Sequence, residues 1–203
     1  MIELDKKEAV WTVTLNRPEK ANSLTEDMLA RLIEIVREAR DLRALILTAK
    51  GRVFSAGADL EEVKTKNLAL SGLWEELSTE IANLPGLTVA ALNGTLAGGA
   101  MGMVLACDLR IAVPGANFFY PVLKRGVLPQ PSDPKRMAAL IGPARTKLIL
   151  MAGQKISAEE AYHFGLIDRI VAPEDLLTTA ETLLEDACAA EADIVSGIAA
   201  LCR

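Results

Sequence analysis

Apolar residues recur along this chain with two periods, and the shorter period predicts strands. Residues 10–15 alternate apolar side chains with threonines, which is typical of a strand with one buried face. Residues 44–48 and 88–92 are short, uncharged runs, as expected for strands buried on both faces. The remaining predicted strands are 109–113, 117–121 and 166–171.

A period near 3.6 predicts helices between these strands. Residues 26–36 carry a broad apolar stripe, and two helix starts remain open, a capping box of Ser23 with Glu26 or a simpler N-cap at Thr25. A capping box at Ser157 starts a later helix. The other predicted helices are 60–63, 72–84, 100–106, 135–141, 144–151 and 174–201. This alternation favours the α/β class with parallel crossovers.

A glycine-rich stretch at 93–108 follows one buried strand directly. Gly98 and Gly99 open a helix of small residues that carries no charge until Asp108. Unpaired backbone N–H groups and the positive end of the helix dipole lie at such a start, so a group that is or becomes negative is expected there. The alternative is that the glycines only allow a tight turn and close helix packing.

A second stretch of small residues, GRVFSAGAD at 51–59, follows another buried strand. Glycine and alanine there allow the backbone to approach a ligand closely. Asp59 is placed to cap a short helix that begins at Leu60.

Composition limits the remaining options. A chain of 203 residues, 51% hydrophobic and 4% aromatic, fits one domain with an aliphatic core, or one domain and a small appendage. A net charge of −5 without a Lys/Arg cluster argues against nucleic acid and anionic membranes as partners. Three cysteines without metal-ligand spacing predict no metal site and reduced thiols. With no signal peptide or membrane-spanning run, a cytoplasmic protein is expected.

Several stretches together carry a resemblance to a known family. They are LNRPEKAN at 15–22, FSAGADL at 54–60, residues 91–108, GPAR at 142–145 and ISAEEAYHFGLID at 156–168. In this order the sequence resembles the crotonase (enoyl-CoA hydratase/isomerase) family. The resemblance implies a ClpP/crotonase-like spiral of ββα units, with a core domain at 1–173 and a shortened C-terminal helical segment at 174–203. It also implies lyase or isomerase chemistry of fatty acid metabolism, homo-trimers or hexamers, and acyl-CoA substrates. No separate cofactor is expected, because coenzyme A is part of the substrate.

The same resemblance assigns roles to individual residues. The backbone N–H groups of Ala58 and Gly99 would form an oxyanion hole for a thioester enolate, and Arg17 and Lys20 would face the phosphates of coenzyme A. As an alternative, Arg17 and Lys20 are ordinary solvated charges. The adenine would lie near the backbone of Ala56, Ala58, Asp59 and Leu60.

The sequence departs from the family where hydratases carry two glutamates. Gly102 and Val122 occupy those substrate-facing positions, and neither side chain transfers protons. Gln130 stands where some relatives carry an aspartate, but its amide only orients water. Asp133 is the remaining acid/base candidate, best with a pKa near neutrality. Its alternative role is the N-cap of the helix that follows.

Two other residues are weaker candidates for proton transfer, Tyr120 and Lys124, which lie in or beside the loop that holds Asp133. His163 is expected at the surface of a late helix. Three functions follow from these assignments. They are an acyl-CoA enzyme with an unusual acid/base group, a non-catalytic acyl-CoA-binding homologue, and a serine hydrolase, which His163 does not support.

Overall fold

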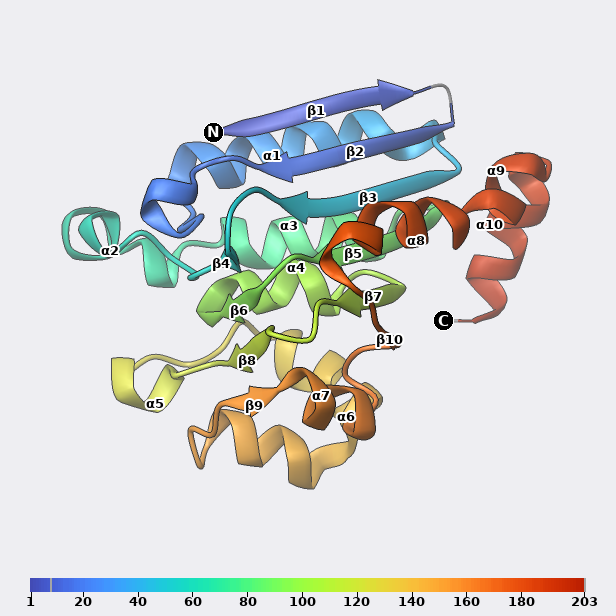
Figure 1. The fold of residues 1–203 in the computed structure, drawn as a ribbon. Coiled ribbons are helices and arrows are strands. Elements are labelled where there is room, and N and C mark those ends of the chain that lie inside the picture. The colour runs from blue at the N-terminus through green and yellow to red at the C-terminus, as the bar shows by residue number, and fades with distance from the viewer. Residues whose placement is uncertain (8, 203) are drawn as a thin grey trace.

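The computed structural model describes residues 1–7 and 9–202, which form two β-sheets covered by helices (Figure 1). The larger sheet has the strand order β1-β2-β3-β5-β7-β10, and the smaller one has the order β4-β6-β8-β9. The strands of the larger sheet are β1 (Ile2–Lys7), β2 (Val10–Leu15), β3 (Ala44–Ala49), β5 (Leu87–Leu92), β7 (Leu109–Ala112) and β10 (Arg169–Ile170). Those of the smaller sheet are β4 (Val53–Ser55), β6 (Thr95–Ala97), β8 (Asn117–Phe119) and β9 (Ile156–Ser157).

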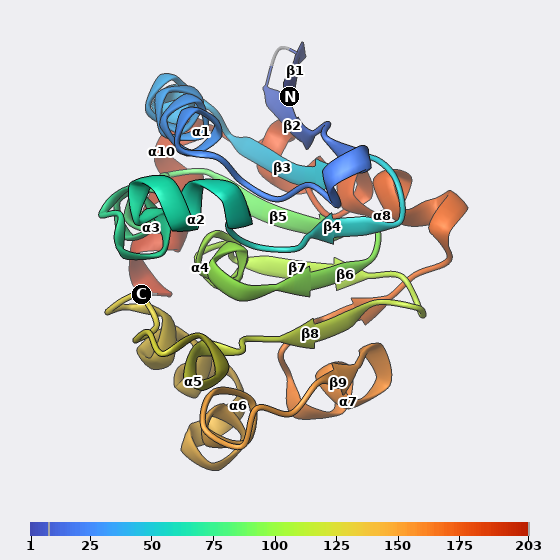
Figure 2. The same ribbon diagram turned by 90° about the vertical axis from the view of Figure 1, so that its left-hand side faces the viewer.

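The α-helices of the described residues lie between the strands and after the last of them. They are α1 (Glu26–Glu38), α2 (Leu60–Lys66), α3 (Leu73–Ala82), α4 (Met101–Leu105), α5 (Val122–Arg125), α6 (Asp133–Leu150), α7 (Ala158–Phe164), α8 (Leu176–Thr182), α9 (Glu185–Ala189) and α10 (Ala192–Leu201). Figure 2 shows α1, α3 and α4 on one side of the larger sheet and α8 on the other. This layering confirms the predicted α/β class.

The larger sheet is parallel from β2 to β10, and β1 is added antiparallel at its edge. The uncharged runs that predicted β3 and β5 are indeed the central strands, and all of β3 is buried. Strand β1 was missed by the periodicity, because its sequence IELDKK is mostly polar and its residues are largely exposed. A charged edge strand of this kind resists pairing with other chains.

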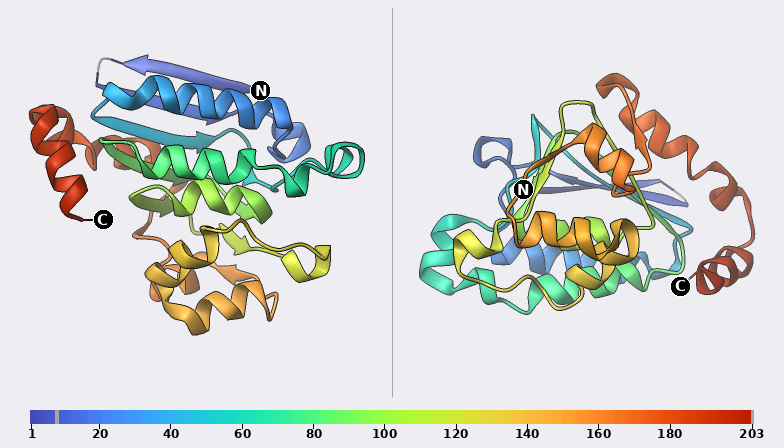
Figure 3. Two further views of the ribbon diagram at one scale, coloured as in Figure 1. Left: turned by 180° about the vertical axis from the view of Figure 1, so that it is seen from behind. Right: turned by 90° about the horizontal axis from the view of Figure 1, so that it is seen from below.

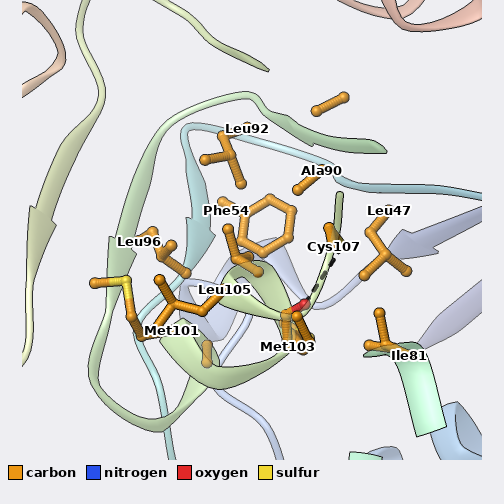
Figure 4. Close-up of a cluster of buried hydrophobic side chains, with 14 of the residues drawn as sticks. Leu47, Phe54, Ile81, Ala90, Leu92, Leu96, Met101, Met103, Leu105 and Cys107 are labelled. Atoms are coloured by element: carbon orange, nitrogen blue, oxygen red, sulfur yellow. Dashed lines mark hydrogen bonds between the residues drawn. The ribbon is translucent and has the colours of Figure 1, made fainter. Parts of the chain in front are cut away.

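The core lies between the larger sheet and the helices α1, α3 and α4. Phe54 of β4, 0% exposed, lies at its centre among Leu92, Leu96 and Leu105 (Figure 4). The buried Sγ of Cys107 donates to Met103 O, and burial raises the pKa of this thiol to about 12, so it stays protonated. Helix α4, which follows the glycines at 98 and 99, is therefore held in the core by close packing.

Helix ends mostly follow the sequence signals. Thr25 is the N-cap of α1 and accepts from Met28 N–H, which decides between the two starts left open, and Ser157 forms the predicted capping box with Glu160. The two helices expected at 135–141 and 144–151 form α6, which is broken at Gly142 with φ 77° and ψ 162°.

The C-terminal region differs from the single amphipathic helix predicted at 174–201. It forms α8, α9 and α10, and the extended backbone of Ala190 and Glu191 separates the last two. Arg43 donates to Ala190 O at 3.1 Å and fixes this break. Leu176 of α8 is buried in the main core, just after the expected boundary at 173.

Helices α9 and α10 lie at the opposite end of the molecule from α2 (Figure 3). Ile194 and Ile198 of α10 are more than half exposed. Among the described residues, no helix has both the length and the apolar character needed to cross a bilayer.

Candidate active site

Two backbone segments of small residues meet at one edge of the smaller sheet. Strands β4 and β6 are parallel neighbours, so the residues that follow them emerge side by side. Gly57 has φ 91°, and a Cβ atom built on it would lie 2.9 Å from Ala97 O and 3.4 Å from Gly99 N. The two segments, 56–58 and 97–99, therefore touch backbone to backbone, and only glycine fits at position 57.

Ala58 and Gly99 each present a backbone N–H at this contact. Leu24 pairs with the flanking peptide groups, donating to Gly57 O at 2.8 Å and accepting from Asp59 N–H at 2.9 Å. Gly99 lies in the first turn of the 3₁₀ helix η4 (Gly98–Ala100), where N–H groups lack intrahelical partners. Within the described residues, neither the Ala58 N–H nor the Gly99 N–H donates a hydrogen bond.

The indole of Trp74 covers the other side of Gly99. A Cβ atom on Gly99 would lie 3.2 Å from two carbons of that ring, and the ring is held by its Nε1–H bond to Leu68 O at 2.8 Å. The position of the Gly99 N–H is thus set by packing as well as by the turn.

Asp133 occupies the space beside Gly102 on α4. A Cβ atom on Gly102 would lie 2.8 Å from Asp133 Oδ1 and 3.2 Å from Oδ2. A carboxylate therefore does lie at the position where the sequence lacks the expected glutamate, but it comes from the first residue of α6. Sequence reasoning named both residues without bringing them together.

The Asp133 carboxyl group is fully buried, with 0% exposure. Its Oδ2 accepts from Tyr120 O–H at 3.0 Å, and its Oδ1 has no partner among the described residues. Burial, and secondarily the charge of Glu75, raises the pKa of Asp133 from 3.8 to about 7, against the opposing effects of Tyr120 and Arg136. Burial disfavours the charged carboxylate, so the group titrates near neutrality.

The expected N-cap role of Asp133 is wrong. Helix α6 already begins at Asp133, its N-cap is Ser132, and Arg136 N–H donates to Ser132 O. Because Asp133 has helical backbone geometry, its side chain is free to turn inward toward Tyr120. Pro134 therefore lies at the second helical position and not at the first, and it has no N–H that needs a cap.

Polar contacts hold the start of α6 against α3. Glu75 Oε2 accepts from Ser132 N–H at 3.2 Å, and Arg136 Nη1 donates to Ser132 Oγ at 2.6 Å and to Ser78 Oγ at 2.9 Å. Tyr120 is 5% exposed, and burial and then Asp133 raise the pKa of its hydroxyl, so it remains a hydrogen-bond donor.

The other candidates near this cluster are less engaged. Val122 is buried in the core at the start of α5, and Lys124 is exposed. Gln130 is half-buried, and its backbone oxygen accepts from Asp133 N–H at 3.1 Å. His163 is exposed on α7, which confirms its expected surface location, and its Nδ1 lies 2.7 Å from Glu159 O.

Arg17 has internal partners instead of facing outward. Its Nη1 donates to Asp59 Oδ2 at 2.7 Å and to Ser23 O and Oγ at 3.0 Å, and this contact lowers the pKa of Asp59. The guanidinium is thus not an ordinary solvated charge, because its Nη1 is held by Asp59 and Ser23. Lys20 is exposed and its ammonium group has no partner among the described residues. Asp59 caps α2 as predicted, accepting from Glu61 and Glu62 N–H.

The backbone near the predicted adenine position is accessible from solvent. Ala56 is exposed, Ala58 is half-buried and the side chain of Leu60 is 56% exposed. These residues and Asp59 form one continuous turn into α2, so the structure does bring them together.

Asn22 positions this region and was not singled out in the sequence. It is 0% exposed with φ 51°, and its Nδ2 donates to Lys50 O at 2.8 Å and Val53 O at 2.7 Å. Its Oδ1 accepts from Arg17 N–H, and its backbone oxygen accepts from Ser55 Oγ. The only sequence signal was the tolerance of asparagine for positive φ. One side chain therefore anchors the strand that leads to Ala58.

Other features of the described residues add no second site. They contain no cluster of His, Cys, Asp or Glu suited to a metal ion. Two open cavities, of about 340 and 440 Å³, are lined by residues around Arg40 and Pro85, and none of their lining residues belongs to the segments described above.

Comparison with known proteins identifies the family to which the chain belongs. The enoyl-CoA hydratase/isomerase family model matches residues 5–199. YngF of Bacillus subtilis, named for that family, is 37% identical over 186 residues, covering 88% of this chain and 72% of YngF. A short-chain-enoyl-CoA hydratase of Clostridium acetobutylicum is 32% identical, covering 89% of this chain and 72% of that protein. The crystal structure of an enoyl-CoA hydratase from Bacillus anthracis matches with a TM-score of 0.90 and 29% identity, covering 98% of this chain and 80% of that one. The chain therefore belongs to the enoyl-CoA hydratase/isomerase family and is an enzyme of that family.

Proposed function

We propose that this enzyme stabilises the enolate of an acyl-CoA thioester with the N–H groups of Ala58 and Gly99, while Asp133 transfers the proton. The observation that carries the proposal is the buried Asp133 Oδ1, which has no partner among the described residues and lies against Gly102. Buried polar atoms are normally hydrogen-bonded, and an unpaired one in a native structure is a mark of function.

The oxyanion part of the proposal rests on backbone geometry. When a proton leaves the carbon next to a thioester, negative charge moves to the thioester oxygen. Two fixed N–H donors stabilise that charge without having to reorganise, and removing one donor costs about 10²–10³ in kcat in known acyl-transfer sites. Ala58 and Gly99 are suited to this because their N–H groups have no acceptor among the described residues.

Asp133 is suited to act as the base. A general base works best with a pKa near the working pH, and the pKa of Asp133 is raised to about 7. Its Oδ1 would take the proton from the carbon chain and return it. Lys20 is exposed and its ammonium group is unpaired among the described residues, so it is the available cation for the coenzyme A phosphates.

A single carboxyl group favours isomerisation over hydration. Syn-hydration in this family uses two glutamates, one to activate water and one to donate a proton, and Gly102 and Val122 replace both. One base is enough to remove a proton from one carbon and deliver it two carbons away. The C–H electrons pass into the enolate, the double bond moves, and Asp133 is regenerated. The proposed reaction is therefore a double-bond shift in an enoyl-CoA.

Asp133→Asn tests the proposal, because it preserves shape and removes the base. Deuterium uptake at the α-carbon of butyryl-CoA in D₂O, followed by NMR, should fall about 10²–10⁴-fold, the usual contribution of a general base. Wild-type exchange should rise with pH and level off above a midpoint near 7, as Asp133 loses its proton. Asp27→Asn, at an exposed position in the first turn of α1, is the matched control and should exchange normally.

Two outcomes would decide against the enzyme as described. Undiminished exchange in Asp133→Asn would remove Asp133 from the mechanism. Binding of acyl-CoA by calorimetry without any exchange in the wild type would instead support the non-catalytic homologue, which the loss of both glutamates favours.

A further inference from the structure

Tyr120 and Asp133 form a buried pair that links two elements of the site. Tyr120 follows β8, Asp133 begins α6, and the bond between Tyr120 O–H and Asp133 Oδ2 is 3.0 Å long. Both side chains are almost fully buried. The segment between them contains α5 and two exposed leucines, Leu123 and Leu128. The pair therefore joins the two ends of a chain segment whose middle part is exposed.

The hydrogen bond makes the two oxygens of the carboxyl group different. Oδ2 is engaged by Tyr120, whereas Oδ1 lies beside Gly102 and has no partner among the described residues. A half-turn of the carboxyl group only exchanges two equivalent oxygens, whereas a partial turn would move the acceptor oxygen away from the tyrosine hydroxyl. A buried hydroxyl that loses its acceptor is penalised, so one orientation is favoured.

We propose that Tyr120 is a positioning residue that fixes the plane of the Asp133 carboxyl group, so that the oxygen beside Gly102, and not the one bonded to Tyr120, exchanges protons with the substrate. This inference rests on the proposed function of Asp133. Tyr120 touches only the base and transfers no proton itself, since its hydroxyl is held in the protonated form by burial and by the neighbouring carboxyl group.

Charged and titratable groups from three elements act on Asp133. Tyr120 beyond β8 and Arg136 on α6 lower its pKa, and Glu75 on α3 raises it. From α4, the facing residue is the uncharged Gly102. Removal of the Tyr120 hydroxyl therefore takes away a group that favours the carboxylate, and the pKa of Asp133 should rise above about 7.

Tyr120→Phe is the first test, with α-proton exchange of butyryl-CoA measured against pH. The midpoint of the rising limb should move up by about half to one pH unit, the size expected for loss of one hydrogen bond to a carboxylate. The limiting rate should fall about tenfold, with the KM for butyryl-CoA nearly unchanged, because a misplaced base affects the proton transfer and not the binding. Tyr162→Phe, at an exposed position on α7, is the matched control.

A second variant keeps the test decisive if Tyr120→Phe does not fold. The chain has two tyrosines, so 3-fluorotyrosine incorporated in a Tyr162→Phe background labels Tyr120 alone. The fluorinated phenol is a stronger donor, and the midpoint should move down instead of up. A midpoint and rate unchanged in both variants would overturn the positioning role. That result leaves Asp133 as the base, whereas normal exchange in Asp133→Asn would overturn the proposed function itself.

Discussion

The two halves of the candidate site are built from different materials. At Ala58 and Gly99 the chemical groups are backbone N–H donors, fixed by a glycine at φ 91° and by two neighbouring parallel strands. Around Asp133 the groups are side chains that come from the residue after β8, from α3 and from α6. The first half depends on which side chains are absent, and the second on which are present.

This difference explains how the second half can change while the first is retained. A backbone donor cannot be moved without changing the path of the chain, and here that path is constrained by direct contact between the segments 56–58 and 97–99. A carboxyl group can reach the same space from another helix, provided that the original position becomes small. Gly102 and Asp133 fit that description, since any side chain at 102 would meet the carboxyl oxygens.

The largest effect expected from a change in the backbone half is that of Gly57→Ala. An L-residue at φ 91° is strained by about 1–2 kcal/mol or more, and its Cβ would lie 2.9 Å from Ala97 O. The two segments must separate, and the Ala58 and Gly99 donors then no longer converge. Exchange at the α-carbon should fall about 10²–10³-fold. Calorimetric binding and thermal unfolding should be measured in parallel.

Gly72→Ala is the matched control for this substitution. Gly72 precedes α3 with φ −66°, and nothing lies within 4 Å of a Cβ atom built there. Its exchange rate and unfolding temperature should stay close to wild type. If Gly57→Ala keeps full activity, the donors are not positioned by this contact and the account of the backbone half is wrong.

Much of the backbone half was predictable from the sequence. Short uncharged runs identified β3 and β5, and the glycines at 98 and 99 identified the start of the helical segment that leads into α4, because backbone geometry imposes a local requirement on residue type. Thr25 could be named as one of two N-caps for the same reason. The resemblance to the family then placed Ala58 and Gly99 together, which neither local pattern could do.

The side-chain half was less predictable, because it depends on contacts across the fold. Asp133 matches the local pattern of an N-cap, and only the arrangement of α4, α6 and β8 turns it inward. Arg17 was assigned to phosphates, but its bond to Asp59 joins residues 42 positions apart and leaves no local signal. Asn22 was overlooked for the same reason, since its acceptors are distant in sequence: Lys50 O follows β3, and Val53 O lies at the start of β4.

A second, smaller effect concerns stability and belongs to the side-chain half alone. The pKa of Asp133 is about 7 in the folded chain, against an ordinary value of 3.8 in an unfolded one. The folded state thus binds a proton more tightly, so stability is present at low pH and is lost as pH rises from about 4 to about 7. The Asp133→Asn variant has no carboxyl group to ionise at this position, so its stability does not fall in this way as the pH rises. Relative to wild type it should gain nothing near pH 4 and, as an upper figure, about 4 kcal/mol above pH 7.

Urea unfolding of both proteins across this pH range measures the difference. Asp27→Asn should follow the wild-type curve at every pH, since Asp27 is exposed. A variant that is less stable than wild type at pH 8, or a gain that does not depend on pH, would mean that Asp133 is not a strained buried acid. A gain in stability with loss of exchange is the expected trade at a site that holds a group for chemistry.

The smallest expected effect is that of Gly102→Ala, which tests whether the two halves share one tightly filled space. The added Cβ would lie 2.8 Å from Asp133 Oδ1, so the carboxyl group must shift, while the φ of Gly102 is compatible with alanine in a helix. The shift displaces Oδ1 but leaves Ala58 and Gly99 in place, so the exchange rate should fall about tenfold with unchanged acyl-CoA binding. If Gly102→Ala exchanges normally, the Asp133 carboxyl group can shift without loss of activity. The contact between its Oδ1 and Gly102 then does not define the reacting atom. If Gly102→Ala loses acyl-CoA binding as well, the two halves are coupled, and the division into a fixed backbone half and a replaceable side-chain half fails.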